Sequence, residues 1–173
     1  MTTVVPVPAP PEDEVDRLVA AWERQRPDLD VAPMRVWSRV TRLARHLDLA
    51  RRQAFARRGL ELSEFDVLSA LRRSGAPYQL SPGRLVTETL VTSGTMTNRV
   101  DRLIAKGLVE RLADPGDRRG VLVRLTATGR AGVDAALEDL LDREQLLLAD
   151  LSAADRTALA DLLRVLVAPF DSR

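Results

Sequence analysis

The residues best suited to binding chemistry lie on one predicted helix that begins at Thr92 and Ser93. Four apolar residues recur along it at helical spacing: Met96, Val100, Leu103 and Ile104. At about 100° per residue, the opposite face carries Thr95, Asn98 and Arg102. Short or planar polar groups of this kind read base edges and phosphates in DNA. A helix face that is merely solvated is the alternative interpretation.

A second polar group lies a little further along the chain, where Asp117 precedes Arg118 and Arg119. The stretches 108–112 and 121–125 are rich in strand-forming residues, so residues 113–120 are predicted to form the charged tip of a hairpin. Arginines at the end of such a ribbon reach into a minor groove, and the neighbouring carboxylate of Asp117 would orient one guanidinium. An ordinary polar turn is the alternative.

The elements that must position these groups are mostly helices. Apolar spacing and stop signals predict helices over 14–25, 34–58 and 64–74, the last opened by Ser63. Another helix follows Ser81 and Pro82, an N-cap with proline at the first helical position. Two short helices joined by a tight turn and followed by a two-stranded ribbon form the winged helix-turn-helix pattern. The predicted fold class is therefore mainly α with a small β-hairpin.

Two leucine-rich helices are predicted at the end of the chain, over 126–149 and 152–168. Ser152 and Asp155 form the cap of the second, and Pro169 closes it. Their leucines exceed what a small DNA-reading core could cover: Leu137, Leu140, Leu141, Leu147, Leu148, Leu159, Leu162, Leu163 and Leu166. A homodimer interface is their expected destination.

The expected organisation has four parts: a proline-containing leader at 1–13, N-terminal helices at 14–58 for dimerisation and effector binding, a DNA-binding core at 59–126, and dimerisation helices at 127–173. Hydrophobic residues make up 45% of the chain and aromatic residues only 3%, which favours helices packed on helices. No apolar run reaches the roughly 20 residues of a membrane span, and the N-terminus lacks the basic region of a signal peptide. A cytoplasmic location is expected.

Several chemistries are excluded by composition. The chain has no cysteine, which rules out disulfides, thiolate metal sites and thiol-based oxidant sensing. His46 is the only histidine, and it is interpreted as a solvated surface residue because a zinc site or a Ser/His/Asp triad would need further partners. No nucleophile-base pair or phosphate-cradling glycine loop is present. We expect no catalytic residue, no metal site and no cofactor, and an enzyme is the weakest interpretation.

Four stretches of the sequence closely resemble the core of the MarR family of transcriptional regulators: 93–103, 107–111, 114–120 and 123–126. The resemblance follows the order of elements from about residue 34 to residue 168, and the wing motif is its most specific part. It implies a homodimer with entwined terminal helices on a pseudo-palindromic operator in double-stranded DNA. It also implies a wing arginine in the minor groove, best matched by Arg119 with Asp117 as its orienting partner. Ser93 and Thr97 of the first stretch complete the predicted DNA-binding set.

An extra N-terminal helix with a tryptophan resembles the urate-responsive PecS-like branch of the family. The resemblance implies a ligand site that uses Trp22, Asp66, Arg73 and Arg99, which would hold a planar anionic heterocycle such as urate. Each residue also has a structural interpretation: Asp66 completes a helix cap, Arg73 serves the C-terminus of its helix, and Trp22 only packs.

The sequence therefore favours a dimeric DNA-binding regulator, a repressor that a planar anionic purine releases from its operator. A ligand-independent architectural or protein-interaction module is the alternative. In that case the four ligand-site residues would be structural.

Overall fold

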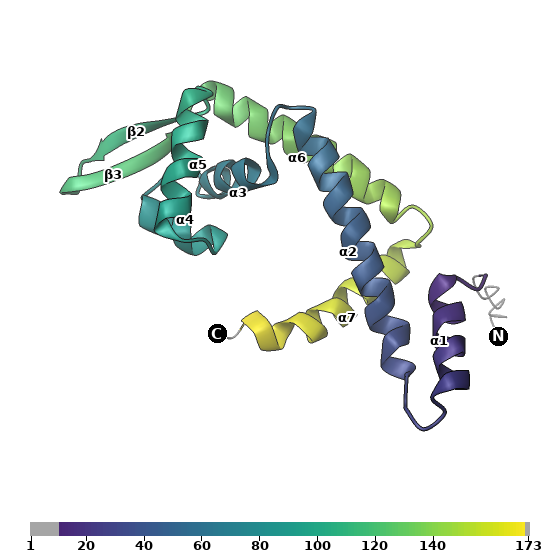
Figure 1. The fold of residues 1–173 in the computed structure, drawn as a ribbon. Coiled ribbons are helices and arrows are strands. Elements are labelled where there is room, and N and C mark those ends of the chain that lie inside the picture. Colours follow the sequence, from purple (N-terminus) through teal and green to yellow (C-terminus); the bar gives the residue numbers. More distant parts are fainter. Residues whose placement is uncertain (1–10, 172–173) are drawn as a thin grey trace, which may run out of the picture. The chain divides into compact units, whose positions relative to one another are not determined.

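The computed structural model describes residues 11–171, except for the side chains of Arg118, Arg119 and Asp171. Ten elements follow one another in this part of the chain: α1 (Glu14–Gln25), α2 (Ala32–Ala56), α3 (Leu62–Arg73), β1 (Gln79–Leu80), α4 (Pro82–Thr89), α5 (Ser93–Ala105), β2 (Val109–Asp114), β3 (Asp117–Leu125), α6 (Ala127–Leu147) and α7 (Ala153–Asp171) (Figure 1). The described chain divides into two compact units, one up to Asp48 and one from Leu49 onward. The predicted mainly helical fold class is confirmed, and the hairpin is part of a three-stranded sheet.

The first unit is a helical hairpin of α1 and the N-terminal part of α2. Three buried valines, Val15, Val19 and Val31, form its core, and Met34 packs against them. Asp13 caps α1, because its carboxylate accepts the backbone N–H groups of Val15 and Asp16. The predicted bounds of α1 are confirmed. The first ten residues of the expected leader lie outside the described residues.

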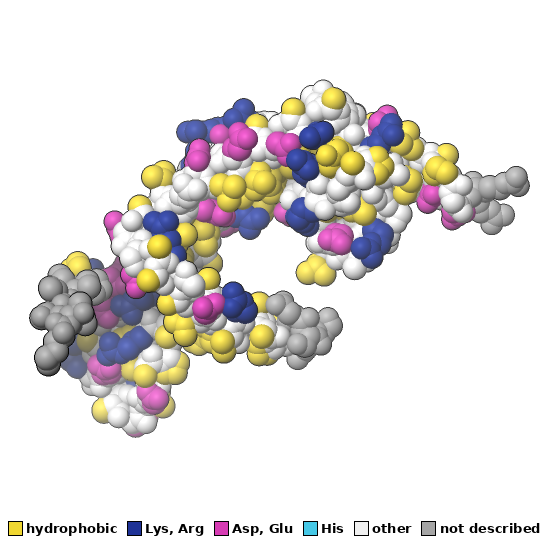
Figure 2. Space-filling model, turned by 180° about the vertical axis from the view of Figure 1, so that it is seen from behind, with side chains coloured by type: hydrophobic (Ala, Val, Ile, Leu, Met, Phe, Trp, Pro, Cys, Tyr) yellow, Lys and Arg dark blue, Asp and Glu magenta, His cyan; other side chains and the backbone are white. Residues whose placement is uncertain are grey.

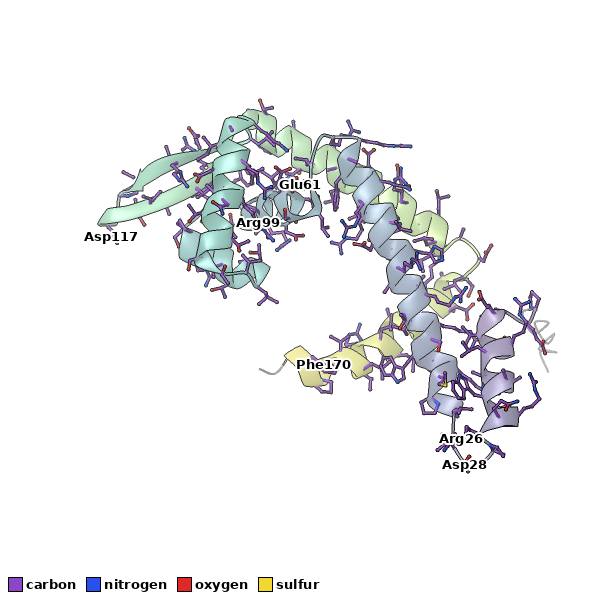
Figure 3. The ribbon with its side chains drawn as sticks, viewed as in Figure 1. Arg26, Asp28, Glu61, Arg99, Asp117 and Phe170 are labelled. Carbon is purple, nitrogen blue, oxygen red and sulfur yellow. The ribbon has the colours of Figure 1, made fainter. Side chains whose placement is uncertain are left out.

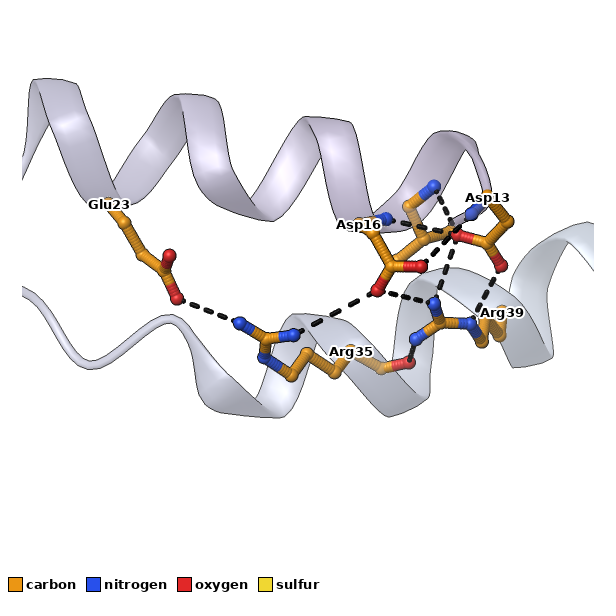
Figure 4. Close-up of polar contacts among 6 residues, drawn as sticks. Asp13, Asp16, Glu23, Arg35 and Arg39 are labelled. Atoms are coloured by element: carbon orange, nitrogen blue, oxygen red, sulfur yellow. Dashed lines mark hydrogen bonds and ion pairs between the residues drawn. The ribbon is translucent and has the colours of Figure 1, made fainter. Parts of the chain in front are cut away.

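Ion pairs join the two helices of this unit (Figure 4). The Arg39 guanidinium on α2 lies 2.9 Å from Asp13 and 2.8 Å from Asp16. Arg35 lies 3.0 Å from Glu23, near the end of α1. The pKa of Asp13 falls to about 2, mainly because Arg39 donates hydrogen bonds to its carboxylate.

The second unit has a larger apolar core, which every element from the end of α2 to α6 supplies. Its largest fully buried side chains include Phe55, Leu68, Leu71 and Leu85. Phe55 and Phe65 stack with their ring centroids 4.1 Å apart. Helix α3 runs through this core and contacts α4, α5 and α6. Leu140, predicted among the interface leucines, is instead a member of the core and only 6% exposed.

The sheet has the order β1-β3-β2 and is antiparallel throughout. Sequence reasoning missed β1, since a strand of two residues cannot show an alternating pattern. Just after the C-terminal end of β3, Gly129 on α6 lies so close to the carbonyl of Leu108 that a Cβ would stand 1.9 Å from its oxygen. Only glycine permits this contact, which seats the first turn of α6 on the base of the hairpin.

Helices α2 and α6 differ by one or two residues from the predicted 34–58 and 126–149, and two other differences have a clear physical reason. Helix α3 begins at Leu62, one residue before the expected N-cap Ser63, because Glu61 and Glu64 form a reciprocal capping box. Helix α7 continues through Pro169 to Asp171, since a proline this near the end of a helix interrupts only its final turn. The Ser152 and Asp155 cap of α7 is confirmed, with the Asp155 N–H donating to the Ser152 hydroxyl over 3.2 Å.

Apolar side chains remain at the surface of α6 and α7 in the second unit. On α6 the exposed ones are Leu137, Leu141, Leu146 and Leu147. On α7 they are Leu162, Leu163, Val165, Leu166, Val167 and Phe170. Figure 2 shows hydrophobic side chains at the surface of the face it presents, beside arginines and carboxylates. Such exposure is typical of helices that another chain covers.

Candidate functional site

Helices α4 and α5 are joined by a three-residue connection that the local sequence determines. Helix α4 begins after Ser81, whose hydroxyl accepts the Arg84 N–H, and ends at Leu90 in the left-handed conformation with φ 53°. Helix α5 begins after Thr92, whose hydroxyl accepts the Thr95 N–H. Both N-caps confirm the predictions from the sequence.

The predicted faces of α5 are confirmed. Met96, Val100 and Leu103 are buried against the rest of the second unit. The residues expected to face DNA are all exposed: Ser93, Thr95, Thr97, Asn98 and Arg102. These five side chains, the DNA-reading row, are exposed along α5 and begin at its N-terminal end. This is the end that a recognition helix inserts into the major groove.

Some of the exposed polar groups of α5 already make contacts within the protein. The Thr97 hydroxyl donates to the Ser93 carbonyl over 3.1 Å, and the Thr95 hydroxyl lies 3.0 Å from that of Thr92. The Arg102 guanidinium lies 3.4 Å from a carboxylate oxygen of Glu61, the residue before α3. Because both partners are more than half exposed, this pair is weak and leaves Arg102 accessible.

The hairpin is longer than the sequence predicts. Strands β2 and β3 extend to Asp114 and from Asp117, so the turn consists of Pro115 and Gly116 in place of the predicted eight residues. The Asp114 carboxylate accepts the Gly116 N–H over 2.9 Å, and this local hydrogen bond stabilises the short turn. A Cβ at Gly120 would stand 2.8 Å from that of Asp114, so the hairpin tip requires glycine there.

The wing arginines belong to this extended hairpin. Arg118 and Arg119 lie in β3, and their side chains are outside the described part of the structure. Asp117 is exposed where β3 begins, at the tip labelled in Figure 3. At the other end of the hairpin, Arg111 on β2 lies 2.7 Å from Asp101 on α5. This ion pair joins the wing hairpin to α5.

Two of the predicted ligand residues line one pocket of the second unit. Asp66 on α3 and Arg99 on α5 border a space of about 410 Å³. Its remaining lining comes from Arg52 on α2 and from residues 60–63 around the start of α3. Asp66 and Arg99 are half-buried, and neither side chain makes a hydrogen bond or ion pair with another described residue. Figure 3 labels Arg99 on α5 and Glu61 at the start of α3.

Arg73 lies at a different pocket. Together with Asp66, Glu88, Thr89 and Leu90 it lines a space of about 240 Å³. Its guanidinium donates to the Ser69 hydroxyl over 2.7 Å and lies 3.9 Å from Glu88. Asp66 thus borders both pockets, with Arg99 at one and Arg73 at the other. Because α3 begins at Leu62, Asp66 lies inside the helix and is not part of its cap.

Trp22, the fourth predicted ligand residue, belongs to the first unit. It lies on α1 and is 46% exposed. Trp37 on α2 is 51% exposed and lines an apolar groove of the same unit with Leu18 and Met34. Both tryptophans of the chain therefore lie in the first unit.

Sequence reasoning missed two features of the site. Arg52 lines the 410 Å³ pocket, but in the sequence it is one of several arginines near the end of α2 and carries no distinguishing signal. The second feature is a buried carboxylate, Glu64, whose ion pair with Lys106 joins α3 to the end of α5 over 2.7 Å. Its partners are 42 residues apart, so no local pattern indicates it.

The described residues give no sign of metal or membrane chemistry. Between residues 11 and 171, no three His, Cys, Asp or Glu side chains gather so as to hold a metal ion. None of the helices in this part of the chain is both long and apolar enough to cross a membrane.

A helix pair with a short turn, followed by a two-stranded hairpin, defines this protein as a winged helix-turn-helix protein. The family model described as "MarR family" matches residues 58–120, which run from just before α3 into β3. The HTH-type transcriptional regulator PecS of Dickeya dadantii is 38% identical over 150 residues, covering 87% of this chain and 90% of the relative. The chain belongs to the MarR family, and its resemblance to PecS supports the predicted PecS-like branch.

Two further relatives agree with this assignment. The HTH-type transcriptional repressor NicR of Pseudomonas putida is 38% identical over 104 residues, 60% of this chain and 64% of the relative. A crystal structure of a MarR mutant from E. coli in complex with operator DNA matches with a TM-score of 0.65 and 28% identity. The match covers 80% of this chain and 99% of that one. The relatives are regulators of transcription and not enzymes, so the chain is a DNA-binding transcriptional regulator.

Proposed function

We propose that the chain acts as a homodimeric repressor on a pseudo-palindromic operator, and that a planar anionic purine such as urate releases it from DNA. In the division proposed from the sequence, residues 59–126 read DNA, residues 14–58 serve dimerisation and effector binding, and residues 127–173 form further dimerisation helices. The DNA contacts come from α5 through Ser93, Thr95, Thr97, Asn98 and Arg102, and from the wing through Arg118 and Arg119, with Asp117 orienting. The exposure of all five α5 residues supports this assignment.

The dimer part of the proposal is supported by the apolar surfaces of α6 and α7. Leu162 is 65% exposed, Val165 72% and Phe170 76%. Leaving so many large apolar side chains in water is unfavourable for a monomer. Sedimentation at micromolar concentration should report a dimer. A monomer would contradict this part of the proposal.

One observation carries the effector part: Arg99, on the helix that presents the DNA-reading row, borders the same pocket as Asp66 with no described partner for either. The guanidinium would pair with the ligand's negative charge, and the carboxylate would accept a ring N–H. A ligand that draws on Arg99 acts directly on α5, which supplies a physical route from pocket to DNA. Arg73 and Trp22 complete the set that the resemblance implies.

The DNA part of the proposal is tested by footprinting DNA that flanks the gene. A dimer should protect two half-sites about one helical turn, roughly 10 base pairs, apart. Asn98→Ala should mainly reduce the preference for the operator over unrelated DNA, because it removes a base contact. Arg119→Ala should weaken binding to both and make the salt dependence shallower, because it removes a charge near phosphates.

The effector part is tested by measuring operator affinity with and without urate. A coupling of about 1–3 kcal/mol would weaken operator affinity roughly 5- to 150-fold. Arg73→Ala should still bind the operator but lose this response. Arg84→Ala is the matched control, since Arg84 is also an arginine paired with Glu88 but lies outside the ligand set. If urate and related purines leave the affinity of the wild-type protein unchanged, the ligand-independent DNA-binding module replaces this part of the proposal.

A further inference from the structure

Glu64 is the one charged residue among the buried side chains of the described chain. It lies in the first turn of α3 and is only 1% exposed. One carboxylate oxygen accepts the Glu61 N–H over 2.9 Å and the Lys106 ammonium over 2.7 Å, while the other is buried without a hydrogen bond. A charge removed from water to this extent is strongly unfavourable unless it is paired. Its presence at this position therefore calls for an explanation beyond stability.

The partner, Lys106, caps the C-terminus of α5, the helix that carries the DNA-reading row. Its ammonium also donates to the Gly59 carbonyl over 3.0 Å, so it contacts the chain on both sides of the start of α3. Its side chain is 40% exposed, and it is the only lysine of the chain. The pair thus joins the C-cap of α5 to the first turn of α3 and to the connection before it.

The other contacts that seat α5 are of a different kind. Met96, Val100 and Leu103 pack into the apolar core, and such contacts are not directional. An ion pair to a buried carboxylate depends strongly on geometry, and fixing the register of packed helices is the best-attested role of buried polar or ionic groups. Base readout needs side chains held to within about 0.5 Å, so register along α5 bears directly on specificity.

We propose that Glu64 and Lys106 are positioning residues for DNA recognition: the ion pair between the buried Glu64 carboxylate and the partly exposed Lys106 ammonium fixes the register of α5 on α3 and so aligns the DNA-reading row with the bases. The pair does not need to touch DNA for this role. The proposal rests on the DNA-reading role of α5 and is independent of any effector.

The decisive variant is Glu64→Gln, which keeps an oxygen to accept the Glu61 N–H but removes the charge that holds Lys106. Operator affinity should fall about tenfold relative to the wild type, in the range of one mismatched base pair, while affinity for unrelated DNA stays the same. Glu12→Gln, which removes a carboxylate from an exposed position before α1, should leave the ratio of the two affinities unchanged. Lys106→Arg should keep most of the ratio, because the cation is retained.

A second pair of variants separates positioning from simple stabilisation. Lys106→Met leaves the Glu64 carboxylate buried and unpaired and should lower the thermal unfolding midpoint more than Glu64→Gln does. Combining the two changes removes both charges, so the midpoint should recover from its value in Lys106→Met while the affinity ratio stays low.

Three results would overturn the proposal. The first is that Glu64→Gln has the same ratio of operator affinity to affinity for unrelated DNA as the wild type. The second is a double variant in which the ratio recovers together with the midpoint, since the pair would then only stabilise the fold. The third is that Lys106→Met loses the same amount of affinity for operator and for unrelated DNA and shows a shallower salt dependence. That result would mean that Lys106 contacts phosphate.

Discussion

The two units of this chain are held together by different physical means. The second unit has an apolar core to which seven successive elements and the end of α2 contribute, with Leu68 and Leu71 completely buried. The first unit has three buried valines and a row of ion pairs between α1 and α2. Of the five carboxyl groups in the described chain whose pKa is lowered, four lie between Asp13 and Asp28.

This difference indicates how each unit responds to its surroundings. Burial of apolar surface depends little on pH or on moderate salt, whereas exposed ion pairs weaken with both acid and salt. We therefore expect the second unit, which carries the DNA-reading row, to resist acid and salt better than the helical hairpin of the first unit. Because both tryptophans lie in the first unit, their fluorescence reports on the hairpin, and far-UV circular dichroism reports on the whole chain.

The largest effect is expected from a cavity in the second unit. Leu68→Ala should lower the free energy of unfolding by about 2–5 kcal/mol, because the side chain is fully buried and its removal leaves a void. Urea unfolding followed by circular dichroism measures this change. The control is Leu90→Ala, which shortens a leucine that is 92% exposed and should cost less than about 0.5 kcal/mol. Equal costs for the two variants would contradict the apolar account of this unit.

Sequence reasoning predicted those elements whose signals are local. Helix α1 was predicted with its observed bounds because its apolar spacing is regular and Pro27 follows it. The caps at Ser81 and Ser152 are single residues with a direct chemical role, so they too could be recognised. The predicted start of α3 was wrong. Serine is the commoner N-cap residue, which favoured Ser63, but the capping box of Glu61 with Glu64 places the N-cap at Glu61.

The sequence predicted which residues belong to the candidate site but not how they lie relative to one another. Helical periodicity correctly separated the buried and exposed faces of α5. Periodicity could not indicate that Arg102 lies beside Glu61 at the start of another helix, or that Asp66 borders two pockets with one arginine at each. Such facts depend on how α3 and α5 pack, which no local pattern of residues encodes.

The next prediction concerns acid, which should act on the first unit. The folded-state pKa of Asp13 is about 2, below its ordinary value of 3.8, because Arg39 stabilises the charged form. The stabilisation is therefore complete above about pH 4 and is lost as the pH falls towards 2. Asp16 and Glu14 shift in the same direction through Arg39 and Arg42. Tryptophan emission recorded from pH 7 to pH 2 should show this loss.

The second unit provides the comparison in the same titration. There the pKa of Asp139 on α6 is lowered by Arg58, which follows α2, so acid weakens this ion pair without removing the apolar core. The circular dichroism signal of the remaining helices should therefore persist to lower pH than the change in tryptophan emission. A single common midpoint for both signals would show that the two units do not differ in this respect.

The smallest expected effect comes from removing one arginine of the hairpin at neutral pH. Arg39→Ala leaves Asp13 and Asp16 without their shared partner on α2, and of the ion pairs described for these two carboxylates only the 3.9 Å contact of Asp16 with Arg35 remains. The side chains of Arg39 and Asp13 are 41% and 47% exposed and that of Asp16 is 27% exposed, and ion pairs in contact with solvent contribute little individually. The urea midpoint of tryptophan emission should therefore fall, but by less than Leu68→Ala lowers the midpoint of the whole chain.

Arg26→Ala is the matched variant, because Arg26 also forms a close pair, 2.7 Å from Asp28, but that partner is two residues away in the connection between the helices. Removing it breaks no described ion pair between α1 and α2, so the emission midpoint should stay at its wild-type value. The two variants should also differ in acid. Without Arg39 the pKa of Asp13 returns towards 3.8, and the change in emission should move to higher pH, whereas Arg26→Ala should leave it in place. If both variants behave alike, the pairing between α1 and α2 is not what holds the first unit together, and its three valines must suffice.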